Sequence, residues 1–205
     1  MIYLILHGSF GYPDENWFPW LKLKLEKEGH KVYSPQLPID DFDKLKPRDS
    51  PKQNLKAWLK SIEDIIKDVS DNEDGLTIIA HSISPAFVLS LINTNPKLKV
   101  EKLVAIAPFL HHGKPPEDYW QFKNVNDSFL KSAEAIISDE SKLNSVKNRI
   151  KESLVIYGDN DPYVTPSESL EYAELLGSEV LVIKGGGHLN AEAGYTEFEE
   201  LLSLI

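Results

Sequence analysis

Short apolar runs recur along the chain, and segments with helical spacing of their apolar positions separate them. The runs are Ile2–Leu6, Lys31–Ser34, Leu76–Ala80, Lys102–Ala107, Leu154–Tyr157 and Val180–Ile183. Short runs bounded in this way predict six strands that alternate with helices. Because βαβ connections place helices on both faces of a sheet, the pattern predicts a parallel sheet inside a three-layer α/β/α sandwich.

Several of the helices can be placed from the sequence. Apolar residues at every fourth position predict a helix over Trp17–Leu25, which Gly29 ends. A long apolar stripe predicts another helix over Leu55–Val69, and Tyr195–Ile205 is predicted to form the last one. Thr165–Glu168 matches a capping box with proline at the first helical position, so a helix is expected to begin there.

Two long segments interrupt this alternation. Pro35–Pro51 is rich in proline and aspartate and is predicted to be a loop. Pro108–Asp127 contains several aromatic residues and follows the fourth predicted strand. Loops at the carboxyl edge of a parallel sheet build the site, so we expect this segment to form a pocket wall or a short lid. The alternative is a surface loop that its aromatic side chains anchor.

Composition narrows the possible partners. The 205 residues fit a single domain over residues 1–205, and the formal net charge of −10 makes nucleic acid an unfavourable partner. The chain has no cysteine, which excludes disulfides, thiolate metal sites and a cysteine nucleophile. Neither a signal peptide nor an apolar run of membrane-spanning length is evident, so we expect a cytoplasmic protein without a membrane partner. A protein partner remains open.

Three predicted strands run directly into residues that can do chemistry. The segment AHSIS (80–84) lies between a strand and a helix, and a serine on such a turn is typical of a nucleophile elbow. The segments YGDNDP (157–162) and GGGH (185–188) follow two later strands. Serine, aspartate and histidine, each just past a strand, occur in the chain order of an α/β-hydrolase triad.

Two serines compete for the role of nucleophile. The residue after the nucleophile must donate its backbone N–H to the oxyanion. Ile83 follows Ser82 and can donate, whereas Pro85 follows Ser84 and has no N–H. We therefore predict Ser82 as the nucleophile and Ile83 as an oxyanion donor. The alternative for Ser82 is an ordinary helix N-cap.

The partners of the serine follow the last two strands. Among the histidines, His188 has both the position and the chain order of a general base, with a solvated loop histidine as the alternative. Asp159 and Asp161 could each orient it, and Asp159 could instead cap its own turn. A metal site built on the two aspartates is a further alternative.

Together these motifs resemble the α/β-hydrolase superfamily, in particular its small serine hydrolases related to retinoblastoma-binding protein nine. The resemblance covers nearly the whole chain and is carried by ILHGS (5–9), AHSIS (80–84), GDNDPYV (158–164) and GH (187–188). The elbow pattern G-x-S-x-G appears here as A-x-S-x-S, with small residues at both flanking positions. The resemblance implies an α/β-hydrolase fold with strand order 2-1-3-4-5-6, a short lid segment and no large cap domain.

The resemblance also implies roles for further residues. The family spacing of glycine, two residues, aspartate, proline and valine matches Gly158 and Asp161, which implies Asp161 as the partner of His188. The turn after the first strand is expected to supply the second oxyanion donor, from the amide of Ser9 or Phe10. Apart from the resemblance, we expect an apolar substrate pocket at the following residues, for which core packing is the alternative: Phe10, Trp17, Phe109 and Trp120.

The sequence thus predicts a serine hydrolase that cleaves small carboxylic esters or related acyl compounds through an acyl-enzyme. Ser82 attacks, His188 takes and returns the proton, and Asp161 holds the imidazole tautomer. The expected partner is a small-molecule acyl substrate, with no cofactor and no metal. The altered elbow glycines motivate one alternative, a binding or interaction protein with little turnover. Another is an acyltransferase or thioesterase with the same triad.

Overall fold

The structure, a computed structural model, describes residues 1–46, 52–71, 74–111 and 120–205. Its centre is a six-stranded sheet in the order β2-β1-β3-β4-β5-β6, in which every neighbouring pair is parallel. The strands are β1 (Ile2–Leu6), β2 (Lys31–Tyr33), β3 (Leu76–His81), β4 (Val100–Ile106), β5 (Ile150–Gly158) and β6 (Glu179–Ile183). The predicted α/β-hydrolase sheet and its strand order are confirmed.

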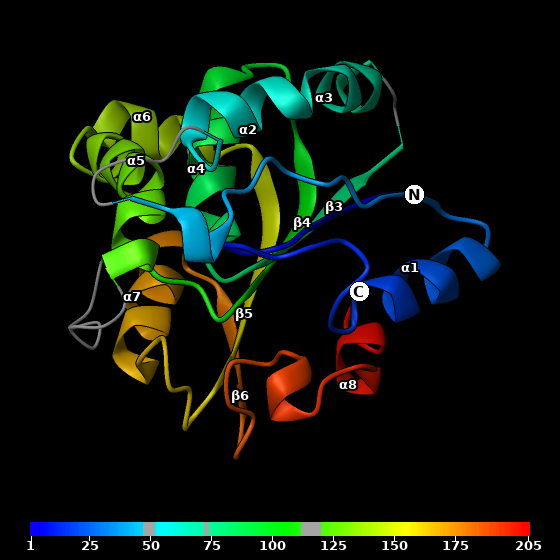
Figure 1. Ribbon diagram of the computed structural model, residues 1–205. Helices are drawn as coiled ribbons and strands as arrows, with labels where there is room; N and C mark the ends of the chain where they lie inside the picture. The colour runs from blue at the N-terminus through cyan, green and yellow to red at the C-terminus, as the bar shows by residue number, and fades with distance from the viewer. Residues whose placement is uncertain (47–51, 72–73, 112–119) are drawn as a thin grey trace.

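Helices cover both faces of this sheet (Figure 1). The first face carries α2 (Leu55–Ser61), α3 (Glu63–Ser70), α4 (Ser84–Thr94), α5 (Trp120–Ile137), α6 (Glu140–Lys147) and α7 (Pro166–Leu176). The second face carries α1 (Phe18–Lys27) and α8 (Glu199–Leu202). The 3-10 helices η1 (Phe42–Lys44) and η3 (Ala191–Ala193) lie in loops.

The apolar runs are continuous because each face of the sheet has its own core. In β1, Leu4 and Leu6 pack into the larger core cluster, whereas Tyr3 and Ile5 pack into the smaller one. Successive side chains of a strand point to opposite faces, so a strand that is covered on both sides needs apolar residues at every position. The pattern that predicted the strands is therefore a consequence of the three layers.

Two sequence expectations need correction. The apolar stripe over 55–69 forms two helices rather than one, because Ile62 lies outside helical geometry and serves as a cap for both α2 and α3. The last helix is only α8, since Gly194 and Phe198, neither of which has helical backbone angles, break the expected segment before it. In the segment expected to form a pocket wall or short lid, residues 120–127 are the beginning of α5 and residues 112–119 lie outside the described part, so this role stays a prediction.

The predicted loop over 35–51 contains η1, and its residues 47–51 also lie outside the described part. Among the helices of the described residues, none is long and apolar enough to cross a membrane.

Candidate active site

Ser82 lies on a tight turn between β3 and α4. Its φ of 62° is in the left-handed region, which non-glycine residues rarely adopt and which is typical of a nucleophile elbow. Its backbone N–H donates to the carbonyl of Ile106 on the neighbouring strand at 2.8 Å. A Cβ added to Gly8 would lie 2.8 Å from the Cβ of Ser82, so only glycine allows the two turns to approach so closely.

The unusual elbow residue Ser84 has a structural role. It is fully buried, and its hydroxyl donates to the carbonyl oxygen of His7 at the end of β1. Ser84 occupies the position at which the family pattern has a glycine, and its hydrogen bond links the elbow to the first turn. Ser84 is thus occupied and inaccessible, whereas Ser82 is partly exposed at the carboxyl edge of the sheet.

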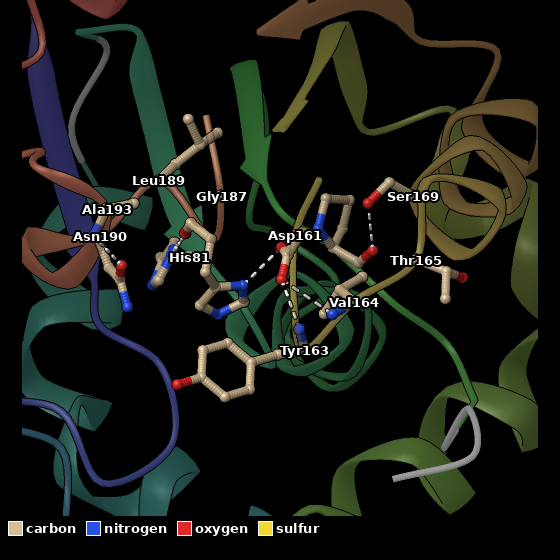
Figure 2. A network of polar contacts seen from close by, with 12 residues as sticks. His81, Asp161, Tyr163, Val164, Thr165, Ser169, Gly187, Leu189, Asn190 and Ala193 are labelled. Atoms are coloured by element: carbon tan, nitrogen blue, oxygen red, sulfur yellow. Dashed lines mark hydrogen bonds and ion pairs between the residues drawn. The ribbon is translucent and has the colours of Figure 1, made fainter. Parts of the chain in front are cut away.

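His188 and Asp161 form a buried pair. Nδ1 of His188 lies 2.7 Å from Oδ2 of Asp161, and their side chains are only 9% and 1% exposed. The other carboxylate oxygen accepts hydrogen bonds from the backbone N–H groups of Tyr163 at 2.8 Å and Val164 at 3.0 Å, as Figure 2 shows. The carboxylate orientation is therefore fixed, and a ring that donates from Nδ1 has Nε2 as its acceptor.

The three side chains of the Asp-Asn-Asp segment all bind the loop that carries His188. Asp159 accepts from the N–H of Gly185, and Asn160 accepts from the N–H of Gly187, each at 2.7 Å. Asp161 then pairs with the ring of His188. Asp159 therefore stabilises the neighbouring loop rather than capping its own turn, and the two aspartates have different environments.

Two buried side chains hold the backbone of the same loop. Nε2–H of His81 donates to the carbonyl of His188, and Nε1–H of Trp17 donates to the carbonyl of Leu189, both at 2.9 Å. The rings of His81 and His188 also lie in contact, with centroids 4.7 Å apart. Burial, with a smaller contribution from the neighbouring His188, lowers the pKa of His81 to about 3, so His81 is neutral.

These contacts correct the sequence prediction for Trp17. The ring is fully buried and contacts Phe18 and Phe198 in the smaller core cluster, so it offers no surface to a substrate. Phe109 is also buried, in the larger cluster, as the core-packing alternative expected. Trp120 begins α5 and is 37% exposed, and its place in a pocket stays a prediction.

The first turn offers one of its two candidate oxyanion donors. The N–H of Phe10 donates to Oε1 of Gln53 at 3.0 Å and is therefore already used. Within the described residues, the N–H groups of Ser9 and Ile83 have no hydrogen-bond acceptor. The Ser9 hydroxyl donates to Oδ1 of Asn126 at 2.5 Å, which fixes the turn. The geometry therefore favours Ser9 over Phe10 as the partner of Ile83.

The ring of His7 stabilises this turn through two hydrogen bonds. It is buried, its Nδ1–H donates to the carbonyl of Gly8 at 2.8 Å, and its Nε2 accepts from the N–H of Leu37 at 3.0 Å. Desolvation by burial lowers the pKa of His7, so the ring is neutral, as this bonding pattern requires. The sequence placed His7 in the turn but gave no signal for Gln53 or Asn126.

The described residues contain no group of three or more histidine, aspartate or glutamate side chains arranged to hold a metal ion. The Asp159 and Asp161 carboxylates instead accept the hydrogen bonds described above.

Comparisons with known proteins agree with this architecture. A family model described as serine hydrolase matches residues 3–205. The ydeN gene product of B. subtilis is similar in structure, with a TM-score of 0.77 and 18% identity over 99% of this chain and 95% of that chain. Est1E from Butyrivibrio proteoclasticus has a TM-score of 0.64 and 16% identity, over 99% of this chain and 84% of that one.

A monoacylglycerol lipase of Paleococcus ferrophilus has a TM-score of 0.62 and 16% identity, over 90% of this chain and 84% of that one. At these identities the structural likeness shows the α/β-hydrolase fold. No curated protein sequence matches the chain significantly.

Proposed function

The chain is a member of the serine hydrolase family, and we propose that it hydrolyses small carboxylic esters through an acyl-enzyme formed on Ser82. The observation that carries the proposal is the buried pair of His188 and Asp161 in the loops beside the Ser82 elbow. The pair directs Nε2 of the imidazole, as a proton acceptor, away from the carboxylate. Ser82 supplies the nucleophile on the strained turn.

In the proposed first half-reaction, Nε2 of His188 takes the proton of the Ser82 hydroxyl as its oxygen attacks the ester carbonyl. The tetrahedral intermediate carries its negative charge on the former carbonyl oxygen, where the N–H groups of Ser9 and Ile83 donate to it. Asp161 stabilises the imidazolium. Collapse breaks the bond to the alkoxy oxygen, which leaves as the alcohol with the proton from His188.

In the second half-reaction, His188 takes a proton from water, and the resulting hydroxide adds to the acyl carbonyl. Collapse of this second intermediate breaks the bond to Ser82 and returns the proton to its oxygen. The carboxylic acid leaves, and the enzyme is restored. Each proton transfer uses the same nitrogen, so one rigidly held imidazole is sufficient for the whole cycle.

The test compares Ser82→Ala with Ser84→Ala. The native protein is expected to react with a fluorophosphonate probe and to hydrolyse p-nitrophenyl acetate. Ser82→Ala should abolish labelling and lower kcat/KM on the order of 10³-fold or more, whereas Ser84→Ala, which lies two residues away, should retain both. Labelling that persists in Ser82→Ala would contradict the proposal. A binding protein with the same fold would show neither labelling nor turnover in the native form.

A further inference from the structure

Four aromatic rings gather beside the proposed site, although they come from distant parts of the chain. The aromatic cluster consists of Phe10 in the first turn, Phe42 in η1, Phe122 in the first turn of α5 and Tyr163 in the loop after β5. Ring centroids of the three phenylalanines lie 5.1 to 5.8 Å apart, and Tyr163 lies 6.4 Å from Phe122. The four rings therefore form one continuous group.

The cluster is a surface feature rather than part of the core. None of its four rings belongs to either core cluster, and Phe42 and Tyr163 are 36% and 45% exposed. Phe10 and Phe122 are half-buried. Aromatic side chains that remain partly exposed at a site, and that hold one another in edge or tilted ring contacts, form a preformed apolar binding surface.

The cluster adjoins the reacting groups at both of its ends. The ring of Tyr163 stands edge-on to the ring of His188, with centroids 5.2 Å apart. Its hydroxyl donates to Glu192 at 2.9 Å, and this bond orients the ring. At the other end, Phe10 directly follows Ser9, whose N–H is the proposed oxyanion donor. A carbonyl whose oxygen lies at Ser9 therefore has the aromatic cluster beside it.

From this geometry we propose that the aromatic cluster binds an apolar arm of the ester, so that the substrates are esters with an alkyl or aryl chain of several carbons. The assignment rests on the proposed function. Each methylene that the rings remove from water increases kcat/KM about two- to fourfold. The proposed substrate class is thus distinct from acetyl esters of short alcohols, which have little apolar surface for the rings to cover.

The experiment measures kcat/KM along two sets of esters. p-Nitrophenyl acetate, butyrate and hexanoate lengthen the acyl arm, and ethyl, butyl and hexyl acetate lengthen the alkoxy arm. In the native protein, the longest ester of at least one set should exceed the shortest at least tenfold. The double variant Phe42→Ala/Phe122→Ala should reduce this ratio below threefold, because it lowers kcat/KM for the longest ester much more than for the shortest. Phe122→Leu, which remains apolar, should preserve most of it.

Leu23→Ala provides the control, because Leu23 is an exposed apolar residue on α1, outside the aromatic cluster, and its removal should not alter the ratio. A ratio near one in both sets, or a double variant that loses long and short esters equally, would overturn the assignment while the labelled serine still upheld the proposed function. If the native protein neither reacts with fluorophosphonate nor hydrolyses any ester, the proposed function fails and this assignment fails with it.

Discussion

Replacing Trp17 by phenylalanine tests whether the buried donors behind His188 matter for turnover. The change keeps an aromatic ring in a fully buried position but removes the Nε1–H that binds the carbonyl of Leu189 at 2.9 Å. A buried carbonyl that loses its donor costs about 1–3 kcal/mol, so the free energy of unfolding should fall by that amount. His81 still donates to the carbonyl of His188, but the loop has lost the hydrogen bond at Leu189.

Catalysis should be more sensitive than stability to this change. A misplacement of about 1 Å in a catalytic group can cost on the order of 10²-fold in rate. Because His81 still holds the carbonyl of His188, we expect a smaller loss, about tenfold in kcat, with KM changed less than twofold. The assay is p-nitrophenyl acetate hydrolysis at a temperature at which urea titration shows the variant to be fully folded.

Trp58→Phe is the matched control. Trp58 is also fully buried, and its Nε1–H also donates to a backbone carbonyl, that of Pro38, at 2.7 Å. The Trp58→Phe variant should therefore lose a similar amount of stability, but the carbonyl that it leaves without a donor is not part of the loop of His188. We expect its kcat to remain within twofold of the native value. Equal kcat in the two folded variants would refute the reasoning.

Three further outcomes are expected. Asp161→Asn should lower kcat on the order of 10³-fold, whereas Asp159→Asn, which keeps an oxygen for Gly185, should lose less than tenfold; equal losses in folded variants would contradict the assignment. Unfolded His81 takes up a proton below about pH 6.5, but the folded residue, with a pKa of about 3, does not, so acidification from pH 8 to 5 should lower the free energy of unfolding by roughly 2 kcal/mol in urea titrations. His7 acts in the same direction, and an unchanged free energy would refute this prediction. Activity should survive prolonged EDTA treatment; loss with EDTA and return with added zinc or manganese would instead indicate a metal mechanism.

The sheet was predictable because its interior position imposes a local signal. A strand that is covered on both faces must be apolar at nearly every position, so six separate runs indicated six strands without knowledge of their contacts. The two-helix break at Ile62 and the short α8 were not predictable in the same way. Both depend on where the backbone departs from helical geometry, and apolar spacing carries no signal for that.

For the site, the sequence alone indicated Ser82 and His188, since each follows a strand and is marked by its neighbours. Pro85 excluded Ser84 by simple chemistry, and the structure adds that the Ser84 hydroxyl is committed to His7. The choice of Asp161 over Asp159 needed a family spacing, because two carboxylates in one loop look alike until their partners are known.

Only the tertiary structure decided the roles of the aromatic residues. Trp17 and Leu189 are joined by a hydrogen bond across 172 positions, so no local pattern could distinguish Trp17 as a support of the His188 loop from a pocket wall. Likewise, Phe42 and Phe122 meet Phe10 only because the loops after separate parallel strands converge at one edge of the sheet. The burial of one face of a helix or of both faces of a strand leaves a regular pattern of apolar residues in the sequence. Contacts between distant loops leave no such pattern, because they depend on how the strands are ordered and how the loops fold over them.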